Sequence, residues 1–133
     1  MSTSFSKTSD EEPIRTIIDI SAWDVKSVKK MEGIFKNTNI IIKAEGWELD
    51  ACTSLREAFY KAKHIDKSIG TWKFKKLDNL SSTFAFAENI KADISKWDTS
   101  KVVYLYHTFE KVALLDDFAA CIGNMDVSSV IDF

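Results

Sequence analysis

Four tryptophans divide the chain into units of nearly equal length. They follow one another at intervals of 24, 25 and 25 residues, at Trp23, Trp47, Trp72 and Trp97. A phenylalanine lies 12 residues after each of them, at Phe35, Phe59, Phe84 and Phe109. Apolar residues also recur eight positions after each tryptophan, at Met31, Leu55, Leu80 and Leu105. A pattern of this length that returns four times is typical of a repeat protein.

The spacing inside each unit predicts its secondary structure. Apolar residues at five, eight, 12 and 15 positions after the tryptophan step by three and four, which is the period of one helical face. We therefore expect short helices over residues 29–37, 53–61, 78–86 and 103–111. The β-prone stretches that end at each tryptophan predict strands over residues 17–23, 40–47, 68–72 and 93–97.

A strand and a helix of about 25 residues cannot bury their own apolar faces, whereas equal units stacked in parallel form a continuous core. The predicted fold class is therefore α/β, a short solenoid of four strand–helix units. The tryptophans and phenylalanines are expected to form ladders in its interior, because an aromatic residue that recurs once per unit packs equally in every copy.

Both ends of such a stack need protection, since a terminal unit exposes apolar surface and an unpaired strand edge. Residues 13–20 add apolar side chains before the first tryptophan, and a truncated fifth copy begins near Ile122. Phe118 and Phe133 are the predicted cap residues. Residues 1–12 are expected to be a flexible N-terminal tail, and residues 13–133 a single repeat domain.

Composition excludes several classes of protein. Apolar residues make up 45% and charged residues 29% of the 133 positions, as in an ordinary globular domain. The net charge of -2 offers no basic footprint for nucleic acid. No stretch has the length of a transmembrane segment or a signal-peptide core, so we expect a cytoplasmic protein that binds no membrane.

The chain shows no pattern of a catalytic or cofactor site. Nucleophile elbows, glycine-rich phosphate loops and paired metal-binding histidines are absent from the sequence. Cys52 and Cys121 form no CxxC pair, and we expect both to be reduced thiols. We therefore predict that the protein is not an enzyme and holds neither a cofactor nor a metal.

The run of residues 93–102, DISKWDTSKV, resembles the hallmark of the mycoplasma-type surface-protein repeats, which are relatives of BspA-like leucine-rich repeats. Residues 19–24 echo this hallmark, and residues 28–35 resemble the segment that follows it in the family. The middle units depart from it, since Glu48 to Asp50 and Lys73 to Lys75 replace the W-D-T-S motif. The resemblance implies a leucine-rich-repeat-like solenoid, used for adhesion or protein contact and without catalytic activity.

In a parallel α/β solenoid the strand side forms a continuous surface on which repeat proteins commonly bind. Alternation from the core position three residues before each tryptophan predicts these partner-binding residues: Asp19, Ser21, Lys43, Glu45, Ser68, Thr71, Asp93, Ser95 and Lys96. Each of them is equally compatible with an ordinary solubilising surface role. The expected partner is another protein, and the chain is otherwise expected to be a monomer.

Three interpretations of that binding remain open. The first is a cytosolic immunity or inhibitor protein that occludes a toxin, for which a basic nuclease domain is a candidate because the predicted face leans acidic. The second is a surface adhesion or protein-interaction module, as the resemblance implies. The third is an assembly scaffold whose open ends stack into oligomers.

Overall fold

The computed structural model describes residues 16–112 and Ser128. Its regular elements are short: β1 (Ile17–Asp19), β2 (Ile41–Lys43), β3 (Glu48–Leu49), η2 (Lys67–Thr71) and β4 (Lys73–Phe74). The strands form two parallel sheets of two strands each, β1 with β2 and β3 with β4. The predicted tail and the cap residues Phe118 and Phe133 lie outside the described residues.

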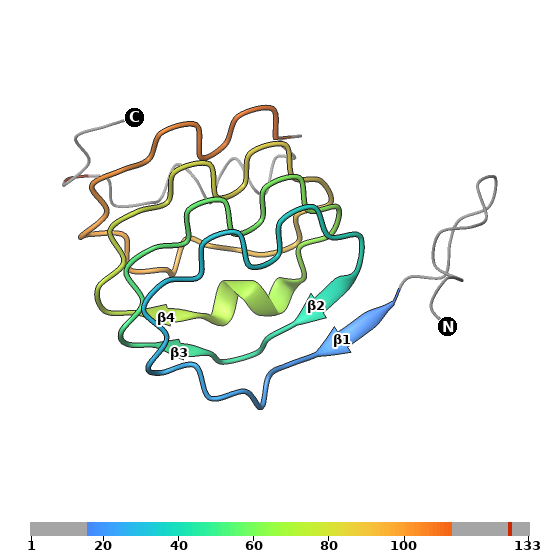
Figure 1. Ribbon diagram of the computed structural model, residues 1–133, viewed down its shortest axis with the longest axis horizontal. Helices are drawn as coiled ribbons and strands as arrows, with labels where there is room; N and C mark the ends of the chain where they lie inside the picture. Colours follow the sequence, from blue (N-terminus) through green and yellow to red (C-terminus); the bar gives the residue numbers. More distant parts are fainter. Residues whose placement is uncertain (1–15, 113–127, 129–133) are drawn as a thin grey trace.

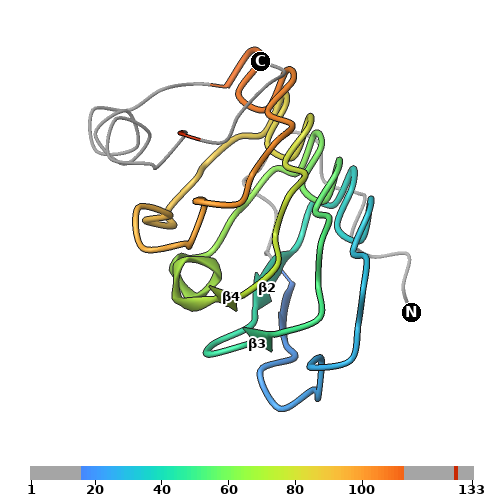
Figure 2. The same cartoon turned by 90° about the vertical axis from the view of Figure 1, so that its left-hand side faces the viewer.

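Successive repeats lie side by side and run in the same direction. Ile17 pairs with Ile41 and Asp19 with Lys43 in the first sheet, and Glu48 pairs with Lys73 in the second. Isolated parallel bridges continue this pairing on the opposite side of each repeat, from Lys30 to Ser54, Asn79 and Tyr104 in turn. Figure 2 shows the repeats following one another from the blue first repeat to the orange fourth, each a single loop of chain (Figures 1 and 2).

The four predicted helices are wrong. The segments of residues 29–37, 53–61, 78–86 and 103–111 consist of turns and isolated bridges. In the second repeat the Ala58 N–H bonds to the Leu55 carbonyl and the Ala62 N–H to the Phe59 carbonyl, each at 2.9 Å. The third residue of each turn, Glu57 or Lys61, has a positive φ of 57° or 60°, as in a type II turn.

Two consecutive four-residue turns explain why the helix prediction failed. They place an apolar residue at every fourth position, which is the same spacing that one face of a helix has. A residue with positive φ every four positions cannot belong to a right-handed helix. The same pair of positive-φ residues recurs in the other repeats: Gly33 and Asn37, Ser82 and Phe86, and His107 and Lys111.

The strand prediction is only partly confirmed. β1 and β2 lie inside the predicted strands over residues 17–23 and 40–47. Residues 68–72 instead belong largely to the 3-10 helix η2, which follows an Asp66 side chain that accepts a hydrogen bond from Ser68 N. Residues 93–97 form no strand. The spacing from Ile65 to Trp72 is one residue longer than that from Ile41 to Trp47, but the spacing from Ile90 to Trp97 is equally long and contains no 3-10 helix.

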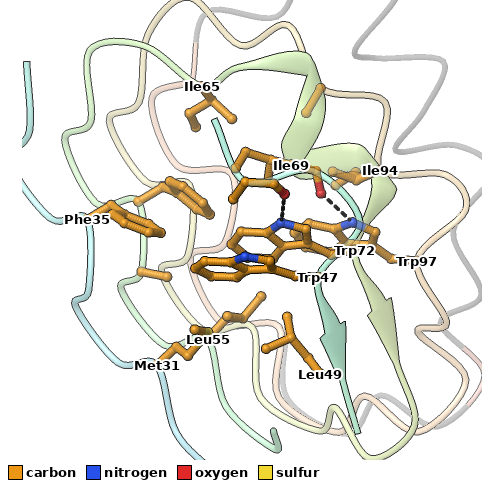
Figure 3. Close-up of a cluster of buried hydrophobic side chains, with 14 of the residues drawn as sticks. Met31, Phe35, Trp47, Leu49, Leu55, Ile65, Ile69, Trp72, Ile94 and Trp97 are labelled. Carbon is orange, nitrogen blue, oxygen red and sulfur yellow. Dashed lines mark hydrogen bonds between the residues drawn. The ribbon is translucent and has the colours of Figure 1, made fainter. Parts of the chain in front are cut away.

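The core contains the two predicted aromatic ladders. Neighbouring indoles of Trp47, Trp72 and Trp97 stack with ring centroids 5.0 and 6.0 Å apart (Figure 3). Phe59 and Phe84 stack at 5.6 Å with rings parallel within 1°. The smaller apolar columns fill the space around them, so that one buried cluster extends from Ile20 to Val102. The prediction that every tryptophan is buried is wrong for Trp23.

The predicted fold class is corrected accordingly. The described residues contain no helix of seven or more residues, and the regular elements are one 3-10 helix and four short strands. The chain is therefore not a strand–helix solenoid, and leucine-rich-repeat-like solenoid is the wrong description. What remains of the prediction is the repeat itself, whose copies pair in parallel through turns rather than through helices.

Candidate functional site

The first repeat exposes four of the six large hydrophobic side chains that are exposed among the described residues; the other two are Tyr104 and Tyr106 of the fourth repeat. Trp23 is 59% exposed, whereas the equivalent Trp47, Trp72 and Trp97 are only 2 to 3% exposed. Ile17, Ile18 and Ile34 of the same repeat are exposed as well. We call this surface, formed by Ile17, Ile18, Trp23 and Ile34, the first-repeat edge. Large apolar side chains gathered at one end of a structure mark a surface that another molecule contacts.

Trp23 differs from the other three tryptophans in its hydrogen bonding. Each later indole donates from Nε1 to a main-chain carbonyl of the preceding repeat: Trp47 to Ile20 at 3.1 Å, Trp72 to Ala44 at 2.8 Å, and Trp97 to Ile69 at 3.1 Å. Among the described residues, Trp23 Nε1 has no such acceptor. One face of its ring stacks on Trp47, with centroids 6.4 Å apart, and the other face has no aromatic neighbour there.

β1 makes the strand side of this edge. Its residues Ile17 to Asp19 are all exposed, and within the described residues it pairs on one side only, with β2. An apolar strand at the end of a sheet presents unpaired main-chain groups to any other strand, and proteins usually protect such strands with charge or cover. The isoleucines of β1 therefore sit at a position suited to adding a further strand.

The turn side of the first repeat has a row of carbonyls that no described residue pairs with. At every junction between repeats, the earlier repeat donates four N–H groups to four carbonyls of the later one, over 2.8 to 3.1 Å. At the first junction the donors are Met31, Gly33, Phe35 and Asn37, and the acceptors are Ser54, Arg56, Ala58 and Tyr60. Because this row has the same direction at all three junctions, the equivalent carbonyls of the first repeat have no donor among the described residues. They belong to Lys30, Glu32, Ile34 and Lys36.

The structure brings four of the predicted partner-binding residues together on β1, β2 and the turns that follow. Asp19 and Lys43 are a register pair, and the Ser21 hydroxyl accepts a hydrogen bond from Glu45 N at 2.8 Å. Hydrogen bonds from Ser21 lower the pKa of Asp19 below its ordinary value, with a smaller contribution from the charge of Lys43. This cluster borders the first-repeat edge, because β1 belongs to both.

The other predicted residues are separated into different environments. Ser68 is buried and accepts from Ala44 N at 3.0 Å, while Thr71 accepts from Gly46 N at 2.7 Å. Both therefore join the third repeat to the second. Asp93 accepts from the Ser95 N–H and hydroxyl, which is a local turn contact. Whether these residues bind a partner stays a prediction.

Lys96 lies in a shallow groove of mixed charge beside β3 and β4. The groove is lined by Lys26, Glu48, Asp50, Lys73, Phe74, Lys75, Lys96 and Asp98. Lys26 pairs with Glu48 at 3.3 Å and Lys75 with Asp50 at 3.5 Å, so the charges of the groove largely satisfy one another. Exposed pairs of this kind contribute about 1 kcal/mol or less, and the groove does not select one sign of partner charge.

The described residues hold little other chemistry. No group of three or more metal-binding side chains occurs within residues 16–112 and Ser128. Cys52 is a free, buried thiol whose pKa is raised by burial, while Cys121 lies outside the described part of the chain. In this same part, no helix has the length and apolar character needed to span a membrane.

Sequence reasoning missed the first-repeat edge because it treated the four tryptophans as equivalent. The signal that distinguishes Trp23 is its order among the described repeats: its unit is the first of them, so none of the others lies before it to offer a carbonyl for its indole N–H. The exposed Ile34 had a similar signal, since the same position holds Ala58, Thr83 and Thr108 in the buried interiors of later repeats.

Comparison with known families identifies the repeat. The sequence pattern of one family matches residues 38–133, well over half of the chain. The chain belongs to the family described as Mycoplasma protein of unknown function, DUF285. No curated protein and no solved structure matches the chain significantly.

This family carries no assigned function, and that corrects one interpretation made from the sequence. The designation as an immunity protein or toxin inhibitor has no support from the family or from the fold, and we do not retain it. The family assignment agrees with the resemblance of residues 93–102 to mycoplasma-type repeats. The location of the protein in the cell stays a prediction.

Proposed function

We propose that this chain is a non-catalytic protein-binding module and that the first-repeat edge is its binding surface. The observation that carries the proposal is the contrast between Trp23, which is 59% exposed, and its three equivalents, which are almost completely buried. Tryptophan is the residue most enriched among those that dominate binding energy at protein interfaces.

Several features of the edge support a protein as the ligand. β1 offers an apolar edge strand, and Trp23 offers both a ring face and an indole N–H. The neighbouring Asp19 and Lys43 provide charged groups at the rim, where interfaces are commonly polar. The described pockets of the chain, in contrast, are open grooves, such as that around Lys96, rather than the enclosed apolar cavities that usually bind small molecules.

Site-specific photocrosslinking tests this proposal. The purified protein would carry benzoylphenylalanine at position 23 and be irradiated in a lysate of the source cells. A matched protein would carry the same group in place of Lys91, an exposed residue six positions before Trp97. We expect a discrete crosslinked protein from position 23 alone. The protein so identified should bind the purified chain, and Trp23→Arg should weaken this binding at least tenfold.

Two results would contradict the proposal. Equal crosslinking from positions 23 and 91 would show that the edge has no preference for a partner. Binding of the purified partner that is unchanged by Trp23→Arg would place the contact elsewhere, for example on the predicted residues of β1 and β2. In that case Lys43→Ala or Glu45→Ala should weaken binding instead.

We also propose the relation to BspA-like repeats and, as the alternative function, a surface adhesion module. The hallmark at residues 93–102 and the regular spacing of the parallel pairings support this relation. Accessibility of the protein to a membrane-impermeant label on intact cells would support adhesion. Protection from that label would favour a partner inside the cell.

A further inference from the structure

The first-repeat edge has the chemistry of one side of a junction between repeats. At each junction the earlier repeat supplies a ring face, a carbonyl for the next indole N–H, and four N–H donors for the next row of carbonyls. The first repeat presents the receiving half of all three contacts: the outer face of Trp23, its indole N–H, and the carbonyls of residues 30, 32, 34 and 36. From this geometry we infer that the edge binds a segment of a partner protein that has the same kind of repeat and occupies the place of a preceding one.

The pattern that such a segment needs can be stated from the contacts within the chain. Its indole or other aromatic ring lies over Trp23, and the carbonyl of the residue three positions before that ring accepts from Trp23 Nε1. This is the relation between Trp72 and Ala44, which precedes Trp47 by three residues. Main-chain N–H groups at eight, ten, 12 and 14 positions after the ring then face the carbonyls of residues 30, 32, 34 and 36, as those of Met31 to Asn37 face the second repeat.

The direction of the hydrogen bonds excludes pairing of two first-repeat edges around a twofold axis. Such an arrangement would place the carbonyl row of one copy against the carbonyl row of the other. Carbonyl oxygens only accept, so each would lose water without gaining a donor, at a cost of about 1 to 3 kcal/mol for every buried group. A partner with the opposite polarity satisfies the whole row.

Head-to-tail stacking through the fourth repeat of a second copy is also disfavoured. It would require an uncovered tryptophan on that repeat to meet Trp23. Trp97, which occupies that position in the fourth repeat, is only 3% exposed. Its ring already stacks on Trp72 and contacts Phe74 and Phe84. Within the described residues, the fourth repeat of a second copy therefore offers no free ring for Trp23.

This inference rests on the proposed function, and a nuclear magnetic resonance titration tests it separately. The full chain is labelled with ¹⁵N, and its four indole N–H signals are recorded; loss of one signal in Trp23→Phe assigns that of Trp23. The probe is an unlabelled synthetic peptide with the sequence of residues 41–64, which contains Ala44 and Trp47 in the required spacing. A peptide of the same composition in scrambled order is the control.

We expect the peptide to move the Trp23 signal saturably at concentrations up to the millimolar range, while the scrambled peptide does not. Ile18→Lys, in exposed β1, should weaken this binding at least tenfold, whereas Tyr104→Ala, an equally exposed substitution in the fourth repeat, should leave it unchanged. Unshifted signals of the three other indoles in both variants confirm that each remains folded.

Three outcomes would overturn the inference. The first is a Trp23 signal that neither peptide moves, which leaves the photocrosslinking result, and with it the proposed function, intact. The second is a mass in sedimentation equilibrium that doubles with concentration and returns to that of a monomer in Trp23→Arg, which assigns the edge to a second copy. The third is a Trp23 signal that moves to the position of an exposed indole when residues 1–15 are deleted, which assigns the edge to the chain itself.

Discussion

The indole Nε1 of Trp72 donates a hydrogen bond to the carbonyl oxygen of Ala44 in the preceding repeat, over 2.8 Å (Figure 3). The donor is buried and the ring lies between those of Trp47 and Trp97. Each junction thus contains a polar contact inside its apolar core. A buried donor and acceptor that satisfy each other fix one register, because a shift of the repeats would leave both unpaired.

Trp72→Phe should lower the free energy of unfolding by about 2 to 4 kcal/mol, from a cavity and from the loss of a donor for the Ala44 carbonyl. Urea-induced unfolding of the variant and the parent measures the difference. Trp23→Phe is the matched control, with an expected loss of about 1 kcal/mol or less because its indole is mostly exposed and its N–H has no acceptor among the described residues. Equal losses for the two variants would contradict the junction described here.

Gly70 is needed because its repeat passes very close to the next one. A Cβ atom at this position would lie 2.5 Å from the carbonyl oxygen and 3.0 Å from the nitrogen of Asp93. Both are main-chain atoms, so neither can move aside without shifting the fourth repeat. Gly70→Ala should therefore destabilise the fold by about 1 to 3 kcal/mol, the usual cost of overpacking, and urea unfolding again measures it.

Gly46→Ala is the control for Gly70. It sits at a positive φ of 71° with no atom within 4 Å of the added Cβ. Its expected cost is about 1 kcal/mol and comes from the backbone alone. A loss for Gly70→Ala no larger than that of Gly46→Ala would show that the two repeats separate easily at Asp93.

The sequence predicted the interior of this protein better than its secondary structure. The columns that contain Leu55, Phe59 and Trp72 are buried as expected, because an apolar side chain that recurs in every copy packs against its counterparts in any parallel arrangement of repeats. The helices failed because spacing alone does not report φ. Glu57 and Lys61 have positive φ values, and neither is a residue type that indicates this conformation.

The structure brings only some of the predicted partner-binding residues together. Asp19 and Lys43 are neighbours on β1 and β2, as alternation along strands implied. Ser68 could not be placed from alternation, because its segment is the 3-10 helix η2 rather than a strand, and Ser68 is buried there. Trp23 was assigned to the core by its spacing, and only its place at the start of the stack makes it exposed.

Asp98 should titrate below the ordinary range of aspartate. The Ser100 hydroxyl and N–H both donate to its Oδ1, over 2.6 and 3.1 Å, and these bonds lower the pKa of the carboxyl. Because the folded pKa is lowered, the stabilising contribution is present above the unfolded pKa and is lost as the pH falls through the folded pKa. A ¹³C titration of the Asp98 carboxyl measures this directly.

Ser100→Ala should raise the pKa of Asp98 towards its ordinary value, since the hydroxyl donor is the largest cause of the shift. Ser95→Ala is the matched control, because its hydroxyl donates to Asp93 and not to Asp98. An Asp98 titration that is the same in Ser100→Ala and the parent would contradict the role of this hydroxyl.

Ser82 tests the turn geometry that replaces the predicted helices. Its φ is 55°, and its side chain makes no hydrogen bond within the described residues. Glycine adopts positive φ without steric cost, so Ser82→Gly should raise the free energy of unfolding by up to about 1 kcal/mol, and the β-branched Ser82→Val should lower it by about 1 to 2 kcal/mol. The adjacent Ser81→Gly should instead lower it by about 0.5 to 1 kcal/mol, since Ser81 is not among the positive-φ residues. If residues 78–86 were helical after all, both glycine substitutions would destabilise the protein to the same extent.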